Sequence, residues 1–237
     1  MAPSSRNRLQ GSASPGVDLA VTLAALAALL AWDASGADLP LVRLFGSPSG
    51  FAWKESFVLA GLVHNGGRVV GWTVFAALLV NVWRPLPLIG HLSPRERTWW
   101  LLTTLACVLL FPVLKHFSLT SCPWDLAEFG GRAIYLSHWR LGVGDGGSGH
   151  CFPSGHASSA FAFLAGYFAL RARHPHAARW WLAAVCALGA VYGWGQMMRG
   201  AHYLSHTLWT AWLSWALTAC SYHLTRRWRG DALPAAA

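Results

Sequence analysis

The stretch Cys151-Phe152-Pro153-Ser154-Gly155-His156 leads from a polar, glycine-rich segment directly into an apolar run that starts at Ala157. It predicts a loop that feeds a helix. Backbone N–H groups in the first turn of a helix have no partner within the helix, so Ser154 and Gly155 are expected to form an anion site there. His156 can exchange a proton near neutral pH. The stretch therefore suggests a phosphate group that is held by N–H groups and protonated by a histidine.

The composition is typical of an integral membrane protein. The chain has 237 residues, enough for one large domain, and includes 15 tryptophans. It is 54% hydrophobic and only 11% charged, whereas soluble domains are about 25% charged. A net charge of +9 would suggest nucleic-acid binding in a soluble protein. Here the arginines form short clusters between apolar runs, so we expect a lipid bilayer and no nucleic acid as partner.

Six apolar runs predict an all-α fold, a polytopic membrane bundle of about six transmembrane helices. Several runs are shorter than the roughly 20 residues that a span requires, so the helices must extend into flanking polar residues. The predicted spans are about 17–32, 66–83, 98–114, 157–170, 180–198 and 206–223. Around the membrane domain, residues 17–226, we expect a disordered cytoplasmic N-terminus (1–16) and a cytoplasmic tail (227–237).

The positions of the arginines predict the orientation of the bundle. The N-terminus, residues 84–97, residues 171–179 and the C-terminus are all basic, and with six spans they share one side. The positive-inside rule makes that side cytoplasmic. Residues 33–65, 115–156 and 199–205 then share the opposite face. In a bacterium the protein would lie in the inner membrane, with this second face toward the periplasm.

Groups suited to phosphate chemistry collect on that outer face. Lys115 offers a point charge at the end of the third span, and Arg199 offers a bidentate fork between the fifth and sixth spans. Three histidines are available for proton transfer or nucleophilic attack: His156, His202 and His206. Ionisable groups at the edge of a membrane are candidates for function. We therefore predict a phosphate site where these segments meet.

The pattern resembles the type 2 phosphatidic acid phosphatase superfamily, which carries three motifs. The first is Lys, six residues, Arg-Pro, and here Lys115 is followed after six residues by Cys122-Pro123. The second, Pro-Ser-Gly-His, is complete at 153–156. The third is Ser-Arg, five residues, His, three residues, Asp. It is partly matched by residues 200–206, Gly-Ala-His-Tyr-Leu-Ser-His.

The resemblance implies a two-step phosphoryl transfer that uses no metal and no other cofactor. The third-motif histidine, His202, would attack phosphorus and form a phosphohistidine, and His156 would protonate the leaving oxygen. Lys115 and the N–H groups of Ser154 and Gly155 would bind the phosphate, and water would then release it. This agrees with the residue chemistry, because phosphoryl transfer needs mainly positioning and charge neutralisation.

The sequence departs from the family pattern at three positions. Cys122 replaces the first-motif arginine, Gln196 replaces the third-motif arginine, and His206 replaces the aspartate. Arg199, one helical turn after Gln196, is a candidate for the missing fork. In an alternative register His206 is the nucleophile, seven residues after Arg199. We favour His202, because Gly-Ala-His-Tyr-Leu-Ser matches the family's Gly-x-His-Tyr-x-Ser better.

Four further residues are candidates for the lost charges. Arg132 or Arg140 is a candidate to replace the first-motif arginine. Asp125 or Glu128 is a candidate to orient a histidine in place of the aspartate.

Two other features bear on the site. Cys122 and Cys151 flank motifs that must converge in an oxidising compartment, so we expect a disulfide between them. His202 and His206 have the i, i+4 spacing of metal ligands, and with His156 or His150 they would make a three-histidine zinc site. There is no glutamate between them, as there is in His-Glu-x-x-His enzymes, and we favour a site without metal.

These observations predict a membrane phosphatase that acts on a lipid-linked phosphate or pyrophosphate at the periplasmic face. An enzyme that transfers phosphate between lipids would use the same residues. A non-catalytic protein that binds lipid phosphates is the alternative from a different class, because two motif arginines and the aspartate are missing. The lipid and the oligomeric state are left open.

Overall fold

A computed structural model describes residues 15–87 and 92–230. Nearly all of the regular structure is helical, which confirms the predicted all-α class. The predictions for the two termini fall largely on residues outside the described part, since α1 starts at Pro15 and α9 ends at Arg229. The long helices are α1 (Pro15–Ser35), α3 (Gly67–Trp83), α4 (Pro94–Phe117), α7 (Pro175–Met198) and α8 (Leu204–Leu224).

Shorter elements complete the chain. The π-helical segment η2 (Phe57–Gly66) runs into α3, and α5 (Ser158–Phe161), η6 (Ala162–Leu164) and α6 (Ala165–Leu170) follow one another. The loops contain α2 (Asp38–Val42), the two-stranded antiparallel sheet of β1 (Gly46–Ser47) and β2 (Gly50–Phe51), and the 3-10 turns η4 (Pro123–Asp125) and η5 (Ala127–Phe129). The last helix is α9 (Arg226–Arg229).

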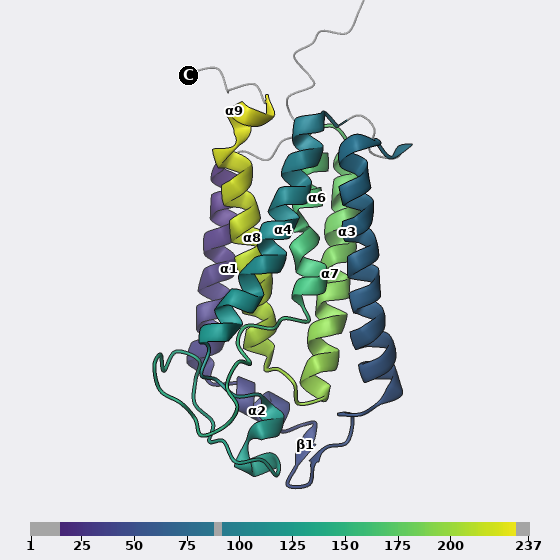
Figure 1. Cartoon of the computed structure of the whole chain (residues 1–237). Helices are drawn as coiled ribbons and strands as arrows, with labels where there is room; N and C mark the ends of the chain where they lie inside the picture. Colours follow the sequence, from purple (N-terminus) through teal and green to yellow (C-terminus); the bar gives the residue numbers. More distant parts are fainter. Residues whose placement is uncertain (1–14, 88–91, 231–237) are drawn as a thin grey trace, which may run out of the picture.

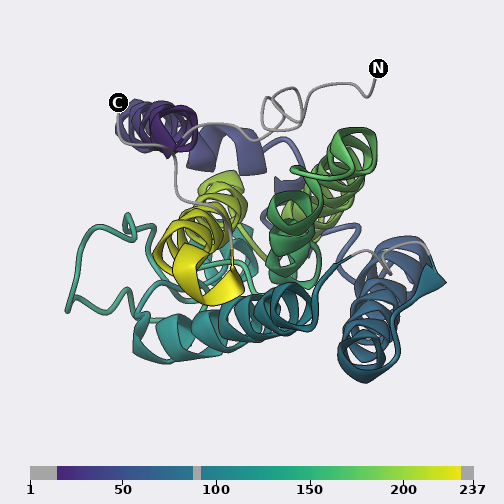
Figure 2. The ribbon, with the colours of Figure 1, turned by 90° about the horizontal axis from the view of Figure 1, so that it is seen from above.

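The helices form one upright bundle (Figure 1). α8 packs against α1, α4, α6 and α7, whereas α3 lies at the side of the bundle against α4 (Figure 2). α9 lies at one end of the bundle, and α2 and β1 lie at the other (Figure 1). Successive helical passages of the chain, with α5, η6 and α6 taken as one passage, run in alternating directions between these two ends (Figure 1).

Within residues 15–87 and 92–230, four helical segments are long and apolar enough to cross a membrane: Pro15–Ser35, Phe57–Trp83, Pro94–Phe117 and Pro175–Met198. They indicate a membrane protein. The segment Ser158–Leu170 is apolar but shorter. α8 has 21 residues, but its buried face carries the hydroxyl residues Thr207, Thr210, Ser214 and Thr218. Because α8 is surrounded by other helices, its polar side chains face protein.

The second passage begins earlier than the sequence predicts. We expected a helix from about residue 66, because His64-Asn65-Gly66-Gly67-Arg68 interrupts the apolar run. The structure instead continues the helix back to Phe57 through the π-helical turns of η2. Gly67 is required there by packing, because a Cβ atom at this position would lie 2.7 Å from the ring of Tyr192. Gly67 thus permits contact between α3 and Tyr192 of α7 without breaking the helix.

The start of α4 follows directly from its sequence. The Ser93 hydroxyl accepts a hydrogen bond from the Glu96 N–H (3.3 Å), and the Glu96 carboxylate accepts one from the Ser93 N–H (2.7 Å). Pro94 occupies the first helical position, where an N–H group is not needed. This reciprocal cap begins the helix four residues before the predicted span.

The connection between α4 and α5 is held together by a buried carboxylate. Asp145 is 5% exposed and accepts hydrogen bonds from the Ser121 N–H, the Ser121 hydroxyl and the Gly147 N–H. Gly147 packs closely here, because a Cβ atom on it would lie 2.3 Å from the Ser121 hydroxyl oxygen. The glycine-rich run thus folds tightly over the end of the bundle.

Candidate active site

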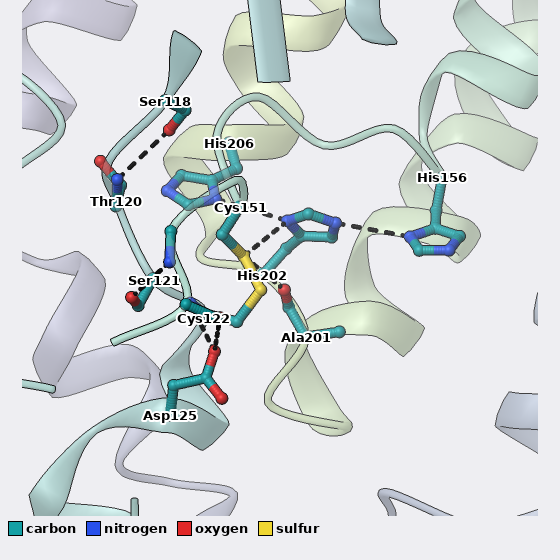
Figure 3. The surroundings of a disulfide bond; sticks show 12 residues. Ser118, Thr120, Ser121, Cys122, Asp125, Cys151, His156, Ala201, His202 and His206 are labelled. Carbon is teal, nitrogen blue, oxygen red and sulfur yellow. Dashed lines mark hydrogen bonds between the residues drawn. A yellow bond between two sulfur atoms is a disulfide. The ribbon is translucent and has the colours of Figure 1, made fainter. Parts of the chain in front are cut away.

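Three segments far apart in the sequence meet at the end of the bundle opposite α9. They are the last turn of α4, the loop from Cys151 to Ala157, and the turn that joins α7 to α8. Figure 3 shows His156, His202 and His206 in a row where the second and third of these segments meet. His202 and His206 are each 1% exposed, whereas His156 is half-buried.

The three imidazole rings are linked through their nitrogen atoms. His156 Nδ1 lies 3.4 Å from His202 Nε2, and His202 Nδ1 lies 3.4 Å from His206 Nδ1. A neutral imidazole carries one N–H group. If His202 donates Nδ1–H to His206, its Nε2 atom keeps a lone pair that faces His156. This is the tautomer in which His202 can attack phosphorus.

Burial favours the neutral form of His202. The pKa of His202 is held well below 6.5, chiefly because burial removes the ring from solvent. Repulsion from His206, His156 and Lys115 lowers the pKa further, and a hydrogen bond to the backbone of Cys151 opposes these effects. The ring is therefore neutral at neutral pH, as a nucleophile must be.

Lys115 reaches the Pro-Ser-Gly-His stretch from α4. Its Nζ atom lies 3.6 Å from where a Cβ atom on Gly155 would be, so the ammonium group lies over this turn. The backbone carbonyl of Lys115 is 2.9 Å from His150 Nδ1. Lys115 is thus brought beside the stretch that the sequence predicted as its partner.

Ser154 has a different role from the one expected. Its N–H group, expected to face an anion, donates to the carbonyl oxygen of His206 (3.2 Å), so this N–H is not open to a ligand. Its hydroxyl oxygen accepts from the Ala157 N–H (3.4 Å), and its carbonyl accepts from the Thr210 hydroxyl (3.0 Å). Ser154 is completely buried and ties the loop to α8.

Gln196 lies beside His156, and Arg199 contacts Gln196. Gln196 is 1% exposed and lines a small pocket together with His156 and Tyr192, and its Nε2 atom has no hydrogen-bond partner. The Arg199 guanidinium donates to the Gln196 side-chain oxygen (3.4 Å) and to the Lys54 carbonyl (2.8 Å). Arg199 therefore contacts the pocket beside His156 through the Gln196 side chain.

A disulfide joins Cys122 and Cys151, with an S–S distance of 1.97 Å and a Cα–Cα distance of 5.2 Å. The Cys151 sulfur lies 3.5 Å from His202 Nδ1 and 3.0 Å from the Ala201 carbonyl oxygen (Figure 3). These are packing contacts, because a disulfide sulfur carries no hydrogen to donate. The disulfide at the first-motif arginine's position thus packs directly against His202.

The four residues that the sequence offered as replacements for the missing charges make no hydrogen bond or ion pair with the three histidines among the residues that the structure describes. The Asp125 carboxylate accepts from the Cys122 N–H (3.3 Å) and the Ser148 hydroxyl (3.0 Å), so it caps its own turn. Glu128 forms an exposed ion pair with Arg43. Within the described part of the chain, neither carboxylate makes a hydrogen bond to a histidine. The remaining two candidates, Arg132 and Arg140, are both exposed.

Sequence reasoning missed His138 and Asp33. The His138 ring stacks on Phe152 with a centroid distance of 4.3 Å, and lies 6.1 Å from the ring of His206. Asp33 Oδ2 is 3.3 Å from His138 Nε2 and accepts hydrogen bonds from the indoles of Trp139 (3.0 Å) and Trp209 (2.9 Å). The sequence feature that could have pointed to Asp33 is its position directly after the first apolar run.

Asp38, which lies far from the site in the sequence, contacts the start of α8. Its Oδ1 atom accepts hydrogen bonds from the Ser205 N–H (3.0 Å) and from the Trp32 indole (2.9 Å). It thereby caps the first turn of α8, where no side chain of α8 does so. The turn that carries His202 and His206 is thus held by a residue of α2.

The comparisons agree with this arrangement. No curated protein and no solved structure matches the chain. The family model of the PAP2 superfamily matches residues 97–229, more than half of the chain and all three segments that carry the histidines and Lys115. The chain therefore belongs to the PAP2 superfamily.

Proposed function

We propose that the protein is a lipid phosphatase that works through a phosphohistidine intermediate. Membership of the PAP2 superfamily supports phosphatase activity on phosphate esters. The observation that carries the mechanism is the row of His156, His202 and His206, with 3.4 Å between neighbouring nitrogens and Lys115 beside it. The apolar helices around the site support a lipid as the substrate.

In the first step His202 Nε2 attacks phosphorus. A nitrogen–phosphorus bond forms, the bond to the leaving oxygen breaks, and His156 gives a proton to that oxygen. Lys115 neutralises charge on the phosphoryl oxygens, and Gln196 can donate its unpartnered Nε2–H to one of them. In the second step a water molecule gives a proton to His156 and attacks phosphorus, the nitrogen–phosphorus bond breaks, and phosphate leaves with His202 restored.

Substrate binding must move His156. A reacting phosphorus atom stands about 3–3.5 Å from its nucleophile, and the leaving oxygen lies beyond it. The present spacing of 3.4 Å between His202 Nε2 and His156 Nδ1 has no room for both atoms. Because His156 is only half-buried, its ring can turn outward and contact the leaving oxygen.

The membrane orientation is part of the proposal. The arginine-rich segments near α9 would face the cytoplasm of a bacterium, and the histidines would face the periplasm across the inner membrane. A Ser137→Cys variant would then react with a membrane-impermeant maleimide in intact spheroplasts. An Arg179→Cys variant would react only after lysis. The reverse pattern would contradict the orientation.

The activity test uses purified protein in detergent micelles. Phosphate release is measured from phosphatidic acid, phosphatidylglycerol phosphate, an isoprenoid pyrophosphate, lipid A phosphate and a soluble aryl phosphate. We expect release from at least one of the lipids, and its loss in His202→Ala. Phosphate that appears on a second lipid would indicate a transferase. Lipid binding without any release would indicate the non-catalytic alternative, and equal rates on the soluble ester would contradict lipid specificity.

His156→Ala separates the two proposed roles. Without a general acid, a substrate with a good leaving group should still phosphorylate His202, whereas an alkyl phosphate should not. Acid-labile, alkali-stable phosphate should therefore accumulate on His156→Ala with the aryl phosphate and be absent from His202→Ala. Full activity in both variants would refute the mechanism.

A further inference from the structure

We propose that reduction of the Cys122–Cys151 disulfide creates a zinc site from Cys122, Cys151, His202 and His206, and that zinc bound there switches the phosphatase off. The metal site stands on geometry alone. The effect on activity rests on the function proposed above.

The ligand atoms already converge. Cys122 Sγ, Cys151 Sγ and a ring nitrogen of His202 all lie within 4.8 Å of one another. His206, whose Nδ1 atom lies 3.4 Å from His202 Nδ1, is the proposed fourth ligand. Two cysteines and two histidines are a common ligand set for structural zinc, and the two histidines have the i, i+4 spacing that lets both face one ion.

Two of the distances between these atoms match edges of a tetrahedral site. With zinc–sulfur bonds of about 2.3 Å and zinc–nitrogen bonds of about 2.0–2.1 Å, a tetrahedron places sulfur and nitrogen about 3.5 Å apart and two nitrogens about 3.4 Å apart. The observed distances are 3.5 Å from Cys151 Sγ to His202 Nδ1, and 3.4 Å between the two Nδ1 atoms. The disulfide itself is what excludes the ion.

The chemistry of the conversion balances. A phosphine or dithiol reductant supplies two electrons and two protons arrive from solvent, so the S–S bond breaks and two thiols form. Zn²⁺ then displaces both thiol protons and binds two thiolates and two neutral imidazoles, which gives an uncharged site in a buried place. Cys122 is only half-buried, so the reductant can attack from its side.

Zinc at this position removes the nucleophile. A neutral imidazole that binds a metal through Nδ1 carries its proton on Nε2. His202 Nε2 is the atom that attacks phosphorus in the proposed mechanism, and with a proton on it there is no lone pair. Reduction alone leaves the ring free. We therefore expect that loss of activity requires the reductant and the metal together.

The metal site is tested with cobalt, because zinc itself has no visible spectrum. The purified protein is reduced with a phosphine, freed of the reductant without air, and titrated with Co²⁺. We expect one equivalent to bind, with the thiolate charge-transfer absorption and strong visible bands of tetrahedral cobalt, and Zn²⁺ should displace it. Binding without thiolate absorption, or no binding, would overturn the proposal.

The oxidised protein is the matched control for the other thiols. It retains Cys107, Cys186 and Cys220 as free cysteines, so any cobalt bound by these three also appears there. A His206→Phe variant, reduced in the same way, tests the fourth ligand and should bind cobalt more weakly, with an altered visible spectrum. Equal spectra from oxidised and reduced protein would refute the site.

Activity is measured on four samples: oxidised or reduced protein, each with or without Zn²⁺. Reduced protein with zinc should lose phosphate release by at least about 100-fold, as expected when a catalytic histidine is held in the wrong tautomer, and a chelator should restore it. Inactivity of reduced, metal-free protein would overturn the switch. Inactivity of all four samples would refute the proposed function, while the cobalt result would still decide the metal site.

Discussion

The Nδ1 atom of His206 lies 3.4 Å from the Nδ1 atom of His202, at the position that the family pattern fills with an aspartate. A second imidazole can accept the Nδ1–H of His202 and so hold its ring in the tautomer required for attack. Unlike a carboxylate, it brings no negative charge to stabilise a histidine cation. In the proposed mechanism, His206 would orient His202 without raising the affinity of His202 for a proton.

Exchanges at His206 test this orientation. His206→Leu removes the acceptor, and we expect kcat to fall by at least about 100-fold because the correct tautomer is no longer favoured. His206→Asp restores the family residue and should retain activity, with the acidic limb of the pH–rate profile moved to higher pH, because the carboxylate stabilises the His202 cation. Unchanged kcat in His206→Leu would contradict an orienting role.

The pH dependence follows from the low pKa of His202. Burial, then the charges of His206, His156 and Lys115, hold this pKa well below 6.5. Attack needs the neutral ring, and a lower pKa keeps the ring neutral to lower pH. The acidic limb of kcat/KM in the disulfide-bonded enzyme should therefore fall below pH 6.5. Acid-treated samples assayed again at neutral pH control for unfolding, and a limb above that value would contradict the prediction.

Gln196 is expected to bind the phosphate through its unpartnered amide. Gln196→Ala removes this donor and should raise KM by about tenfold, the cost of one hydrogen bond to a charged group. Gln196→Glu has nearly the same size but places a negative charge toward the phosphate, so its KM should rise further. Steady-state kinetics on the preferred lipid measures both, and equal KM values in all three proteins would refute the contact.

A buried ion pair joins α1 to the end of α6 at the end of the bundle near α9. Arg171 donates two hydrogen bonds to Asp18, at 2.8 and 2.7 Å, and both side chains are less than 5% exposed. Asp18→Ala leaves the Arg171 charge buried without its carboxylate, so the free energy of unfolding should fall by about 3–5 kcal/mol. Denaturant titration in micelles measures this.

The exposed pair of Arg43 and Glu128 provides the control for that prediction. Solvent and salt screen its charges. Glu128→Ala should leave the unfolding transition nearly unchanged. Equal destabilisation in the two variants would show that burial is not what makes the Asp18 pair important.

The sequence alone was sufficient for the fold class and for much of the site. Apolar runs of helical length can bury their backbone groups in lipid only as helices, so the all-α bundle follows from composition and pattern. Pro-Ser-Gly-His, Lys115 and the His202 segment were enough to recognise the family, whose model matches residues 97–229. The start of α4 can also be predicted from the local sequence, since Ser93, Pro94 and Glu96 form its N-terminal cap.

Only the tertiary structure decided which groups share the site. Asp38 and Asp33 lie more than 150 residues before Ser205 and Trp209, and only folding brings their carboxylates to α8. Folding also directs the N–H of Ser154 to His206 instead of to a ligand. Helical periodicity places His202 and His206 four residues apart, but the 3.4 Å between their nitrogens depends on how the loop of Cys151 packs against α8. Spacing along a chain determines which face a side chain occupies, and packing between segments determines what it meets there.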